Sequence, residues 1–428
     1  MSRFQLTVGS DAFWRGAAAD IAGARRRVLV QAMTFEGDGA GAALAQALLA
    51  ARAPDRRLLI DAYSFHVVND TMLPTLPWRA RSVRDEARAT RGLLDRLAGH
   101  GVAVAVTEPV GRNPLRFPLR NHKKLLVIDD VAWLGGINFS DHNFAWHDLM
   151  VRIDDAQVAE FLAGTFADDW HGTPRAIAGR FGTLDLLSLD GASNEATLAP
   201  VLDLFANAQR SIELVGAYPT RPFTDALATA AKRGCAVTIH TPSANNKPLL
   251  RDYLFDLARR CPALKLNLLP GMTHAKAALV DGETLLFGSV NFNVASWRSN
   301  GDLLAITRDA GLIAAFERDL FAPAQAAGQL ADRPALSLWR RARARLTLAA
   351  SDAVLARLSF GTGPRVSRWP AASAFPEPPL LRAAPGRAAS VGTEPLADRP
   401  DAPWAAARRD RSDAGDDDRL VPEIGEPV

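Results

Sequence analysis

One pattern occurs twice in the chain, and this repetition constrains the fold more than any other feature. Each copy reads His-x-Lys, an apolar run, Asp, a turn, a second apolar run, and Gly-Gly/Ser-x-Asn. The first copy comprises His122, Lys124, Asp129, Gly135, Gly136 and Asn138. The second copy comprises His274, Lys276, Asp281, Gly288, Ser289 and Asn291. Two short apolar runs separated by a turn predict a β-hairpin, so we expect two equivalent hairpins.

The residues of each copy are suited to phosphate chemistry. Alternate side chains of an extended strand share a face, so His122 and Lys124 are expected to lie side by side. His274 and Lys276 have the same spacing. The returning strand then brings the asparagine of its copy beside them. An imidazole, an ammonium and an amide together can hold and attack a phosphate, whereas the alternative, two surface hairpins with chance His and Lys residues, requires one coincidence to occur twice.

This pattern resembles the signature of the phospholipase D superfamily, HxKxxxxD followed by a G[SG]xN strand. The second copy matches that spacing, with six residues between Asp281 and Gly288. The first has five between Asp129 and Gly135, which predicts a hairpin turn shorter by one residue. The resemblance implies an α/β fold. The implied fold consists of two pseudo-twofold-related phospholipase D-like α/β/α domains that are packed to share one active site. Each domain is expected to have a mixed, largely parallel sheet with flanking helices.

The surrounding sequence also repeats. Residues 28–62 read as strand, helix and strand, an order that implies parallel strands joined by a crossover helix. Residues 205–242 repeat this order, so an internal duplication is the economical explanation. We expect a first phospholipase D-like domain at 1–180, a second at 181–330, an amphipathic C-terminal helix at 331–360, and a low-complexity, disordered tail at 361–428.

Composition limits the class of protein. The 428 residues are 48% hydrophobic, which suits buried cores and excludes a disordered chain. A run of about 18 apolar residues is absent, and the N-terminus lacks the layout of a signal peptide. We therefore expect a cytoplasmic protein, peripheral at the inner face of the membrane. Cys235 and Cys261 are expected to be ordinary buried thiols.

Charge is unevenly distributed along the chain. The net charge is +3, but residues 371–428 hold seven basic and eleven acidic residues, which leaves +7 on residues 1–370. A basic folded body suits anionic partners: phospholipid head groups, an anionic membrane surface or nucleic acid. Nucleic acid is the least favoured, because a basic stripe studded with aromatic residues is not evident. The sequence implies no obligate protein partner.

Three segments each allow two interpretations. Residues 72–81 and 112–120 mix apolar and cationic residues, which is typical of an interfacial loop that touches lipid or of a lid packed on its own domain. Residues 336–346 mix apolar and basic residues in a predicted helix. This pattern fits either a membrane-surface helix or a helix packed on the body with its arginines in water. A charged helix is also expected at 83–100.

The resemblance further implies a mechanism that requires neither metal nor cofactor. In the superfamily one histidine forms a covalent phosphohistidine and the other protonates the departing alcohol; a second alcohol or water then attacks the intermediate. By resemblance His122 is assigned as the nucleophile and His274 as the general acid. The lysines and asparagines of both motifs should bind the phosphoryl oxygens. A carboxylate downstream of the opposite motif should orient each histidine, and the candidates are Asp148 and Asp302.

Other residues have supporting roles or none. Asp129 and Asp281 are expected to shape the turns rather than touch substrate. Relatives usually have Glu at the position of Asp302, which is one methylene shorter. The other histidines have no second partner at ligand spacing and are expected to be structural or exposed, although the first and fourth lie near predicted strand ends on the side of the motifs: His66, His100, His142, His147, His171 and His240.

The sequence around the motifs is most similar to that of bacterial cardiolipin synthases. The similarity lies in Trp146-His147-Asp148 after the first motif and Gly271-Met272-Thr273 before the second. Those enzymes are phosphatidyltransferases that move a phosphatidyl group from one phospholipid to the alcohol of another, commonly phosphatidylglycerol. The alternative is a phospholipase D or nuclease-type phosphodiesterase, with water as the acceptor. A third interpretation, a catalytically silent membrane-binding scaffold, is disfavoured because a scaffold needs neither histidine.

Overall fold

The computed structural model describes residues 2–72, 80–110, 116–331, 336–358 and 365–369. Most of the predicted loop at 72–81, the start of segment 112–120 and most of the predicted tail lie outside these residues. Residues 1–386 form one unit, and the features below all belong to it.

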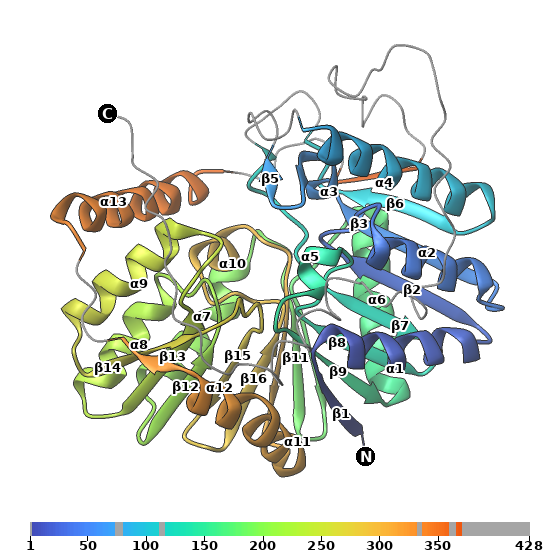
Figure 1. The fold of residues 1–428 in the computed structure, drawn as a ribbon. Coiled ribbons are helices and arrows are strands. Elements are labelled where there is room, and N and C mark those ends of the chain that lie inside the picture. Colours follow the sequence, from blue (N-terminus) through green and yellow to red (C-terminus); the bar gives the residue numbers. More distant parts are fainter. Residues whose placement is uncertain (1, 73–79, 111–115, 332–335, 359–364, 370–428) are drawn as a thin grey trace, which may run out of the picture. The chain divides into compact units, whose positions relative to one another are not determined.

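Seven strands from the first half of the chain and one strand from residues 366–368 build an eight-stranded mixed sheet (Figure 1). Its central strands are short apolar runs that are buried on both faces, as in sheets covered by helices on each side. The pairs β2–β3 and β3–β6 are parallel, because helical crossovers join these strands. In spatial order the strands are β1 (Arg3–Val8), β9 (Leu149–Asp154), β8 (Val131–Gly135), β7 (Leu125–Ile128), β2 (Arg27–Ala32), β3 (Asp55–Asp61), β6 (Ala103–Thr107) and β19 (Val366–Arg368).

The second half builds a nine-stranded sheet on the same plan. Its parallel pairs are β12–β13 and β13–β14, again joined by helical crossovers. In spatial order the strands are β10 (Ile177–Phe181), β11 (Leu184–Ser188), β17 (Leu303–Thr307), β16 (Thr284–Gly288), β15 (Ala277–Val280), β12 (Ser211–Val215), β13 (Ala236–Pro242), β14 (Leu264–Leu269) and β18 (Gln329–Leu330).

The two sheets repeat strand for strand. The order β9-β8-β7-β2-β3-β6 corresponds to β17-β16-β15-β12-β13-β14, which confirms the predicted duplication and its two crossover units. The prediction of largely parallel sheets is wrong. Outside the crossover strands, the described pairs are antiparallel, because each motif hairpin and the strand after it fold back directly on their neighbours. The first hairpin turn is shorter by one residue, as predicted: Ile128 pairs with Val131, whereas Val280 pairs with Thr284.

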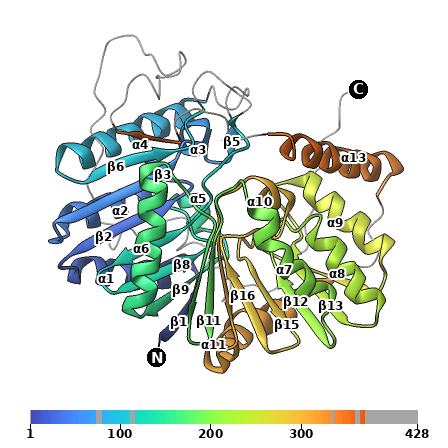
Figure 2. The ribbon, with the colours of Figure 1, turned by 180° about the vertical axis from the view of Figure 1, so that it is seen from behind.

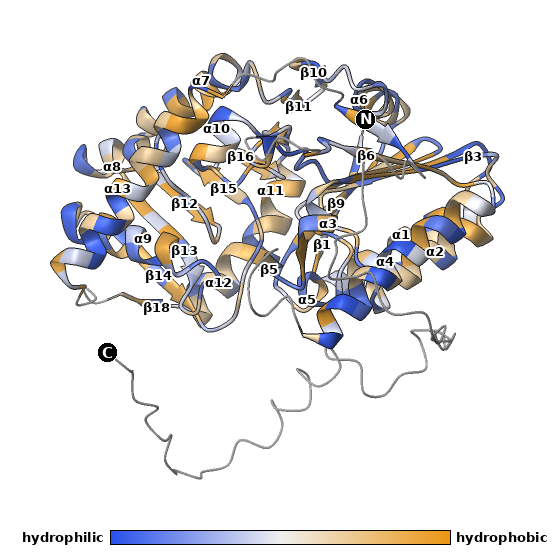
Figure 3. Cartoon of the chain, turned by 90° about the horizontal axis from the view of Figure 1, so that it is seen from above, coloured by the Kyte–Doolittle hydropathy of each residue, from blue (hydrophilic) through white to orange (hydrophobic). Residues whose placement is uncertain are grey.

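Helices cover both sheets (Figures 1 and 2). Hydrophobic residues are concentrated in the strands, and the helices carry both hydrophobic and hydrophilic residues (Figure 3). The outer face of the first sheet packs against α1 (Ser10–Gly23), α2 (Gly39–Ala50) and α4 (Arg81–Gly99). The outer face of the second packs against α7 (Asn194–Ala206), α8 (Phe223–Lys232), α9 (Pro248–Arg260) and α13 (Leu338–Leu355). Short elements complete the described fold: α3 (Tyr63–His66), β4 (Val67–Val68), β5 (Thr71–Met72), α5 (Asp141–Phe144), α10 (Val294–Arg298), η3 (Glu317–Phe321) and α12 (Ala322–Ala327).

The inner faces of both sheets share one apolar core with α6 (Ala156–His171) and α11 (Ala310–Phe316). Leu125 of the first motif hairpin and Ala277 of the second both belong to it. Local signals set the ends of α6: the Asp155 carboxylate accepts from the N–H groups of the first turn, and Gly172 ends the helix in a left-handed conformation with φ 76°. The shared core holds the two hairpins in one body.

Two predicted boundaries need correction. The first domain was expected to end at residue 180, but this point falls inside β10, which pairs with β11 in the second sheet. Residues 365–369, expected to be disordered, contain β19, which pairs with β6. Arg365 donates to Glu108 at 2.7 Å, and the Trp369 ring stacks on Phe65 with centroids 5.5 Å apart, so side chains anchor this strand.

The other segments fall where the sequence placed them. The charged helix is α4, and both cysteines are buried and free. Within segment 112–120, the described part contacts both halves, since Arg120 pairs with the buried Asp61 at 2.7 Å and the Arg120 carbonyl accepts from the Gly301 N–H at 2.9 Å. The helix at 336–346 is α13, which packs on α9, and Arg340 and Arg341 pair with aspartates there while the Arg340 side chain stays 41% exposed. In the described residues we find no helix with the length and apolarity to span a membrane.

Candidate active site

The turn aspartates tie each motif hairpin to the loop that precedes the neighbouring strand. Asp129 has a positive φ of 49°, and its carboxylate accepts from the backbone N–H groups of residues 25–27 at 2.8, 2.8 and 3.0 Å. Asp281, with φ 54°, does the same for residues 209–211. Neither aspartate lines the pocket described below. These hydrogen bonds fix where each hairpin, and the histidine before it, lies along the neighbouring strand of the sheet.

Two short parallel bridges join the halves next to the motif histidines. The first joins Asn121 to Gly301, and the N–H of the following residue, His122, donates to the Gly301 carbonyl at 2.7 Å. The symmetric bridge joins His147 to Thr273. Each bridge therefore holds the residue before a histidine of one half against the residue before an aspartate of the other half.

These bridges place each candidate carboxylate on the histidine of the opposite half. Nδ1 of His122 lies 2.8 Å from Oδ1 of Asp302, and Nδ1 of His274 lies 2.7 Å from Oδ2 of Asp148. All four side chains are buried. Because an ionised carboxylate only accepts hydrogen bonds, each Nδ1 carries the proton and each Nε2 keeps its lone pair.

Small residues at the end of each returning strand make room for these carboxylates. A Cβ on Gly136 would lie 2.2 Å from Oδ1 of Asp148, so a larger residue would displace that carboxylate. At the equivalent position Ser289 donates to Oδ1 of Asp302 at 2.6 Å. Cβ atoms on Gly135 and Gly288 would lie 2.2 and 2.3 Å from backbone oxygens of the next strand. The Gly-Gly and Gly-Ser sequences therefore permit the close approach that pairing of each histidine with the aspartate of the opposite half requires.

Lys124 and Lys276 lie behind the histidines and are only 1% and 2% exposed. Each ammonium donates to the backbone carbonyl of the histidine two residues earlier, at 2.6 Å in the case of Lys124. Burial, and then repulsion by Lys276, lowers the pKa of Lys124, and burial lowers the pKa of Lys276 to about 8. Neither lysine is part of the pocket wall. Their contribution to the pocket is electrostatic.

The same surroundings favour neutral imidazoles. Burial, and then the charge of Lys124, lowers the pKa of His122 to about 4. Burial and Lys276 lower the pKa of His274 to about 3. The aspartate partners oppose these effects without reversing them. A neutral imidazole with a free lone pair on Nε2 can act as a nucleophile.

Both histidines line one pocket with a volume of about 210 Å³. Asn138 and Asn291 line it as well, so each half contributes a histidine and an asparagine. The Asn138 side chain is fixed, because its Oδ1 accepts from the Thr34 N–H at 3.1 Å and its Nδ2 donates to the next asparagine along the chain, residue 143, at 2.9 Å. The predicted residues of both motifs thus gather in one place, with the asparagines at the wall and the lysines behind it.

Polar side chains from both halves also meet at this pocket. Nδ2 of Asn246, just before α9, donates to Oδ2 of Asp70, in the β4–β5 turn, at 3.0 Å. Nζ of Lys247 lies 3.5 Å from the same carboxylate, and the Tyr218 hydroxyl donates to Asn246 at 2.7 Å. These contacts link the halves a second time, independently of the two bridges.

Sequence reasoning missed the aromatic part of the wall. Tyr63, Trp146 and Tyr218 line the pocket, and the rings of the last two lie 5.4 and 5.9 Å from that of His274. Aromatic rings beside a reacting imidazole exclude water and lower the local dielectric constant. The sequence indicates Trp146 only through the resemblance to cardiolipin synthases, and no local pattern marks the two tyrosines.

His142 is a second miss. It was expected to be structural or exposed, yet it lines the pocket with its Nδ1 3.4 Å from Oε2 of Glu36, another residue of the wall. Its position between Asn138 and Asp148, both of which reach the site, is the signal that could have identified it. The remaining five histidines lie outside the pocket wall; for example, His66 packs edge-on against Phe117 and His147 lies 3.4 Å from Thr273.

Three carboxylates cluster at one side of the pocket. Ligand oxygens of Glu36, Asp38 and Glu86 lie within 4.8 Å of one another, which is the one such group among the described residues that could hold a metal ion. Burial raises the pKa of Glu36 to about 8, that of Asp38 to about 7 and that of Glu86 to about 8. At neutral pH the cluster therefore retains protons.

The Glu36→Gln variant is expected to become more stable relative to the wild type as pH rises. A carboxyl with a raised pKa in the folded state contributes stability that is present below its unfolded value, near 4.5, and is lost as pH rises through about 8. Glutamine has no proton to lose. Urea unfolding at several pH values between 5 and 9 measures the difference, with the exposed Glu283→Gln as the control, and a pH-independent difference would contradict the raised pKa.

The chain matches known proteins over most of its described length. A family model described as "Cardiolipin synthase, PLD-like domain" matches residues 18–170 and 201–322, one segment in each half. Cardiolipin synthase A of Citrobacter koseri is 26% identical over 344 residues, covering 72% of this chain and 66% of the relative. Cardiolipin synthase A of Pseudomonas putida is 28% identical over 331 residues, covering 72% and 65%. The chain thus spans slightly less than two thirds of the length of these relatives.

A solved structure shares the fold. The phosphatidylserine synthase of Haemophilus influenzae Rd KW20 superposes with a TM-score of 0.64 at 15% sequence identity, covering 83% of this chain and 95% of that one. The duplicated sheets, the two motif hairpins and the match of the family model to more than half of the sequence lead to one conclusion. The chain belongs to the phospholipase D superfamily, in the family of the phospholipase D-like domain of cardiolipin synthase.

Proposed function

We propose that the protein is a phosphatidyltransferase of the cardiolipin synthase type, acting on phosphatidylglycerol-like phospholipids at an anionic membrane surface. The observation that carries the proposal is the crossed pairing around one pocket: His122 with Asp302, and His274 with Asp148. Two oriented imidazoles facing one cavity supply a nucleophile and a proton donor together. Family membership and the relatives named cardiolipin synthase A support the choice of a phospholipid substrate.

In the first step, Nε2 of His122 attacks the phosphorus of the donor phospholipid. A phosphorus–nitrogen bond forms as the bond to the head-group oxygen breaks, and that oxygen takes a proton from Nε2 of His274. His274 must therefore be protonated in the complex. The negative charge of a bound phosphodiester beside the ring raises its pKa and so opposes burial, which lowers it.

In the second step, His274 acts as the base. Its Nε2 takes the proton of an acceptor alcohol, whose oxygen attacks phosphorus while the phosphorus–nitrogen bond to His122 breaks. A lipid alcohol as acceptor gives transfer, and water gives phosphatidic acid. Asn138 and Asn291 donate to the phosphoryl oxygens from the wall, and Lys124 and Lys276 add positive potential from behind it.

A product assay tests the proposal. The full chain is incubated with phosphatidylglycerol vesicles and the lipids are separated; a second sample is quenched with denaturant at neutral pH, because a phosphorus–nitrogen bond is acid-labile, and is examined for a phosphatidyl group on His122. Cardiolipin plus glycerol is the expected result. Phosphatidic acid as the main product would establish the hydrolase alternative in its place, and the absence of both products would overturn the assignment.

Transfer is expected to survive removal of divalent cations. In both steps described above, the bonds to phosphorus and the proton transfers involve only imidazole nitrogens and substrate oxygens. Activity after exhaustive dialysis against EDTA should therefore equal that before dialysis. If EDTA removes the activity, Mg²⁺ or Ca²⁺ restores it, and the Glu36→Gln variant cannot be restored in this way, the carboxylate cluster would instead be a cation site used in the reaction.

A further inference from the structure

Helix α13 is fixed in one orientation by its inner side. Ala344 and Leu348 are buried against the outer core of the second half. Arg340 donates to both carboxylate oxygens of Asp252 on α9, at 3.0 and 2.7 Å, and Arg341 donates to Asp256 at 2.7 Å. The two aspartates are almost fully buried, so these ion pairs are partly desolvated and hold the helix against rotation.

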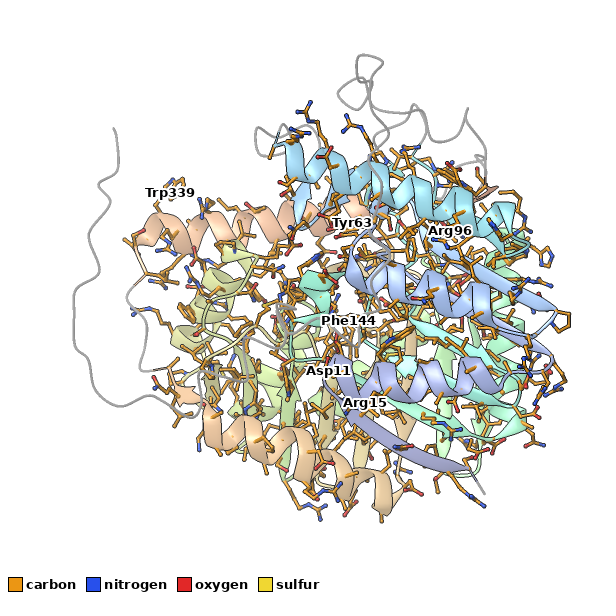
Figure 4. The ribbon with its side chains drawn as sticks, turned by 45° about the vertical axis from the view of Figure 1, so that its right-hand side comes forward. Asp11, Arg15, Tyr63, Arg96, Phe144 and Trp339 are labelled. Atoms are coloured by element: carbon orange, nitrogen blue, oxygen red, sulfur yellow. The ribbon has the colours of Figure 1, made fainter. Side chains whose placement is uncertain are left out.

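The fixed orientation exposes apolar side chains on the opposite side. Leu338, Trp339, Leu346 and Val354 are 78%, 65%, 69% and 53% exposed. They are four of the six exposed large hydrophobic residues in the part of the chain that the structure describes. Figure 4 shows Trp339 on the outer side of α13. We call these four residues the α13 outer face; such a concentration of apolar groups in water marks an interaction surface.

Positive charge flanks the α13 outer face. Arg343 and Arg345 approach the α9 aspartates only at 3.8 and 3.6 Å, and nearly half of each side chain is exposed. The Arg343 guanidinium lies 4.9 Å from the centre of the Trp339 ring. The helix holds four arginines and one aspartate. An exposed apolar stripe beside arginines, with a tryptophan near one end, is the composition of helices that lie in the interface of an anionic bilayer.

The location of α13 relates this surface to the pocket. Lys247 and Leu250, at the start of α9, line the pocket, and α13 packs along α9. Asp70, in the β4–β5 turn, lines the pocket from the other half. Figures 1 and 2 show α13 and β5 at the same upper edge of the described chain. A flat partner resting on α13 would therefore also lie beside the elements that line the pocket.

We propose that the α13 outer face docks the protein on the surface of an anionic phospholipid bilayer. Trp339 and Leu346 enter the boundary between head groups and acyl chains, and Arg343 and Arg345 contact lipid phosphates. Arg340 and Arg341 hold the helix to the body meanwhile. This docking deepens the proposed function, on which it rests for the choice of a phospholipid surface, and it is measured as binding without turnover.

Co-sedimentation with vesicles tests the proposal. The full chain should bind vesicles of phosphatidylglycerol and phosphatidylcholine more tightly than pure phosphatidylcholine vesicles. The double variant Trp339→Ser/Leu346→Ser should bind at least about tenfold more weakly, since two large apolar groups no longer enter the bilayer. Arg343→Gln and Arg345→Gln should each weaken binding about fivefold on the anionic vesicles alone, and this difference should vanish at high salt.

Leu330→Ser is the matched control. Leu330 is 60% exposed but lies on β18, away from α13, so its replacement should leave vesicle binding unchanged. Equal losses in the control and the double variant would overturn the assignment of binding to this face. So would wild-type protein that ignores anionic vesicles, or a concentration-dependent dimer that the double variant abolishes, because the face would then be covered by a second copy of the chain. If the wild-type protein binds anionic vesicles but transfers no phosphatidyl group, the result would count against the transferase proposal alone.

Discussion

Replacing His122 or His274 by alanine is expected to lower phosphatidyl transfer by at least about 10³-fold, because each variant removes one half of the nucleophile and acid pair. The two losses should differ in kind. His122→Ala removes the atom that bonds to phosphorus, whereas His274→Ala removes the proton for the leaving oxygen. A donor with a nitrophenyl leaving group needs no such proton, so it should restore the first step in His274→Ala and not in His122→Ala.

The measurement is the initial rate with natural and nitrophenyl donors, together with detection of the phosphoryl enzyme. His100→Ala is the control, since this histidine is exposed and its Nδ1 contacts only the carbonyl of residue 96 on its own helix. If the nitrophenyl donor rescues His122→Ala instead, the two roles are reversed. Substantial transfer in both alanine variants would remove the histidines from the mechanism altogether.

Asp148→Asn and Asp302→Asn are expected to lower transfer by about 10² to 10⁴-fold each, by analogy with the loss when an orienting aspartate is replaced in a Ser-His-Asp site. An amide can donate to Nδ1 as well as accept from it, so the histidine tautomer is no longer enforced. The crossed pairing makes the phenotypes predictable. Asp302→Asn should resemble His122→Ala, and Asp148→Asn should resemble His274→Ala and respond to the nitrophenyl donor.

The exposed Asp130→Asn is a suitable control, since Asp130 pairs with Arg26 at the surface. Circular dichroism of each variant separates lost orientation from lost folding, as both catalytic-site aspartates are buried. Identical responses of Asp148→Asn and Asp302→Asn to the nitrophenyl donor would argue against distinct roles for the histidines that they contact.

The repeated motif made the duplicated architecture predictable, because two short apolar runs separated by a turn fix a hairpin locally. The strand order then follows from short connections. The share of parallel pairs was overestimated because the crossover units are parallel, whereas the motif hairpins and the strands after them pair antiparallel with their neighbours. The strand β19 was missed because its stability comes from contacts far away in the chain, with Glu108 and Phe65, which composition does not reveal.

For the candidate site, the residues named from the motifs are brought together, whereas those that shape the pocket were harder to find. Glu36, Tyr63 and Tyr218 follow strands or precede helices in segments without a spacing signal. They reach the pocket only because the sheet places the ends of distant strands at one edge. His142, on the short helix α5, was identifiable only from its position between Asn138 and Asp148 in the sequence.

The exchange of carboxylates between the halves has an evolutionary consequence. After a gene duplication the two copies usually become free to diverge, but here position 122 depends on position 302, 180 residues away, and position 274 depends on position 148, 126 residues away. A substitution that leaves one half of the chain unaffected can therefore harm the other half. Selection should keep these distant positions inherited together, while positions whose partners lie in their own copy, such as Glu36 and His142, remain free to specialise.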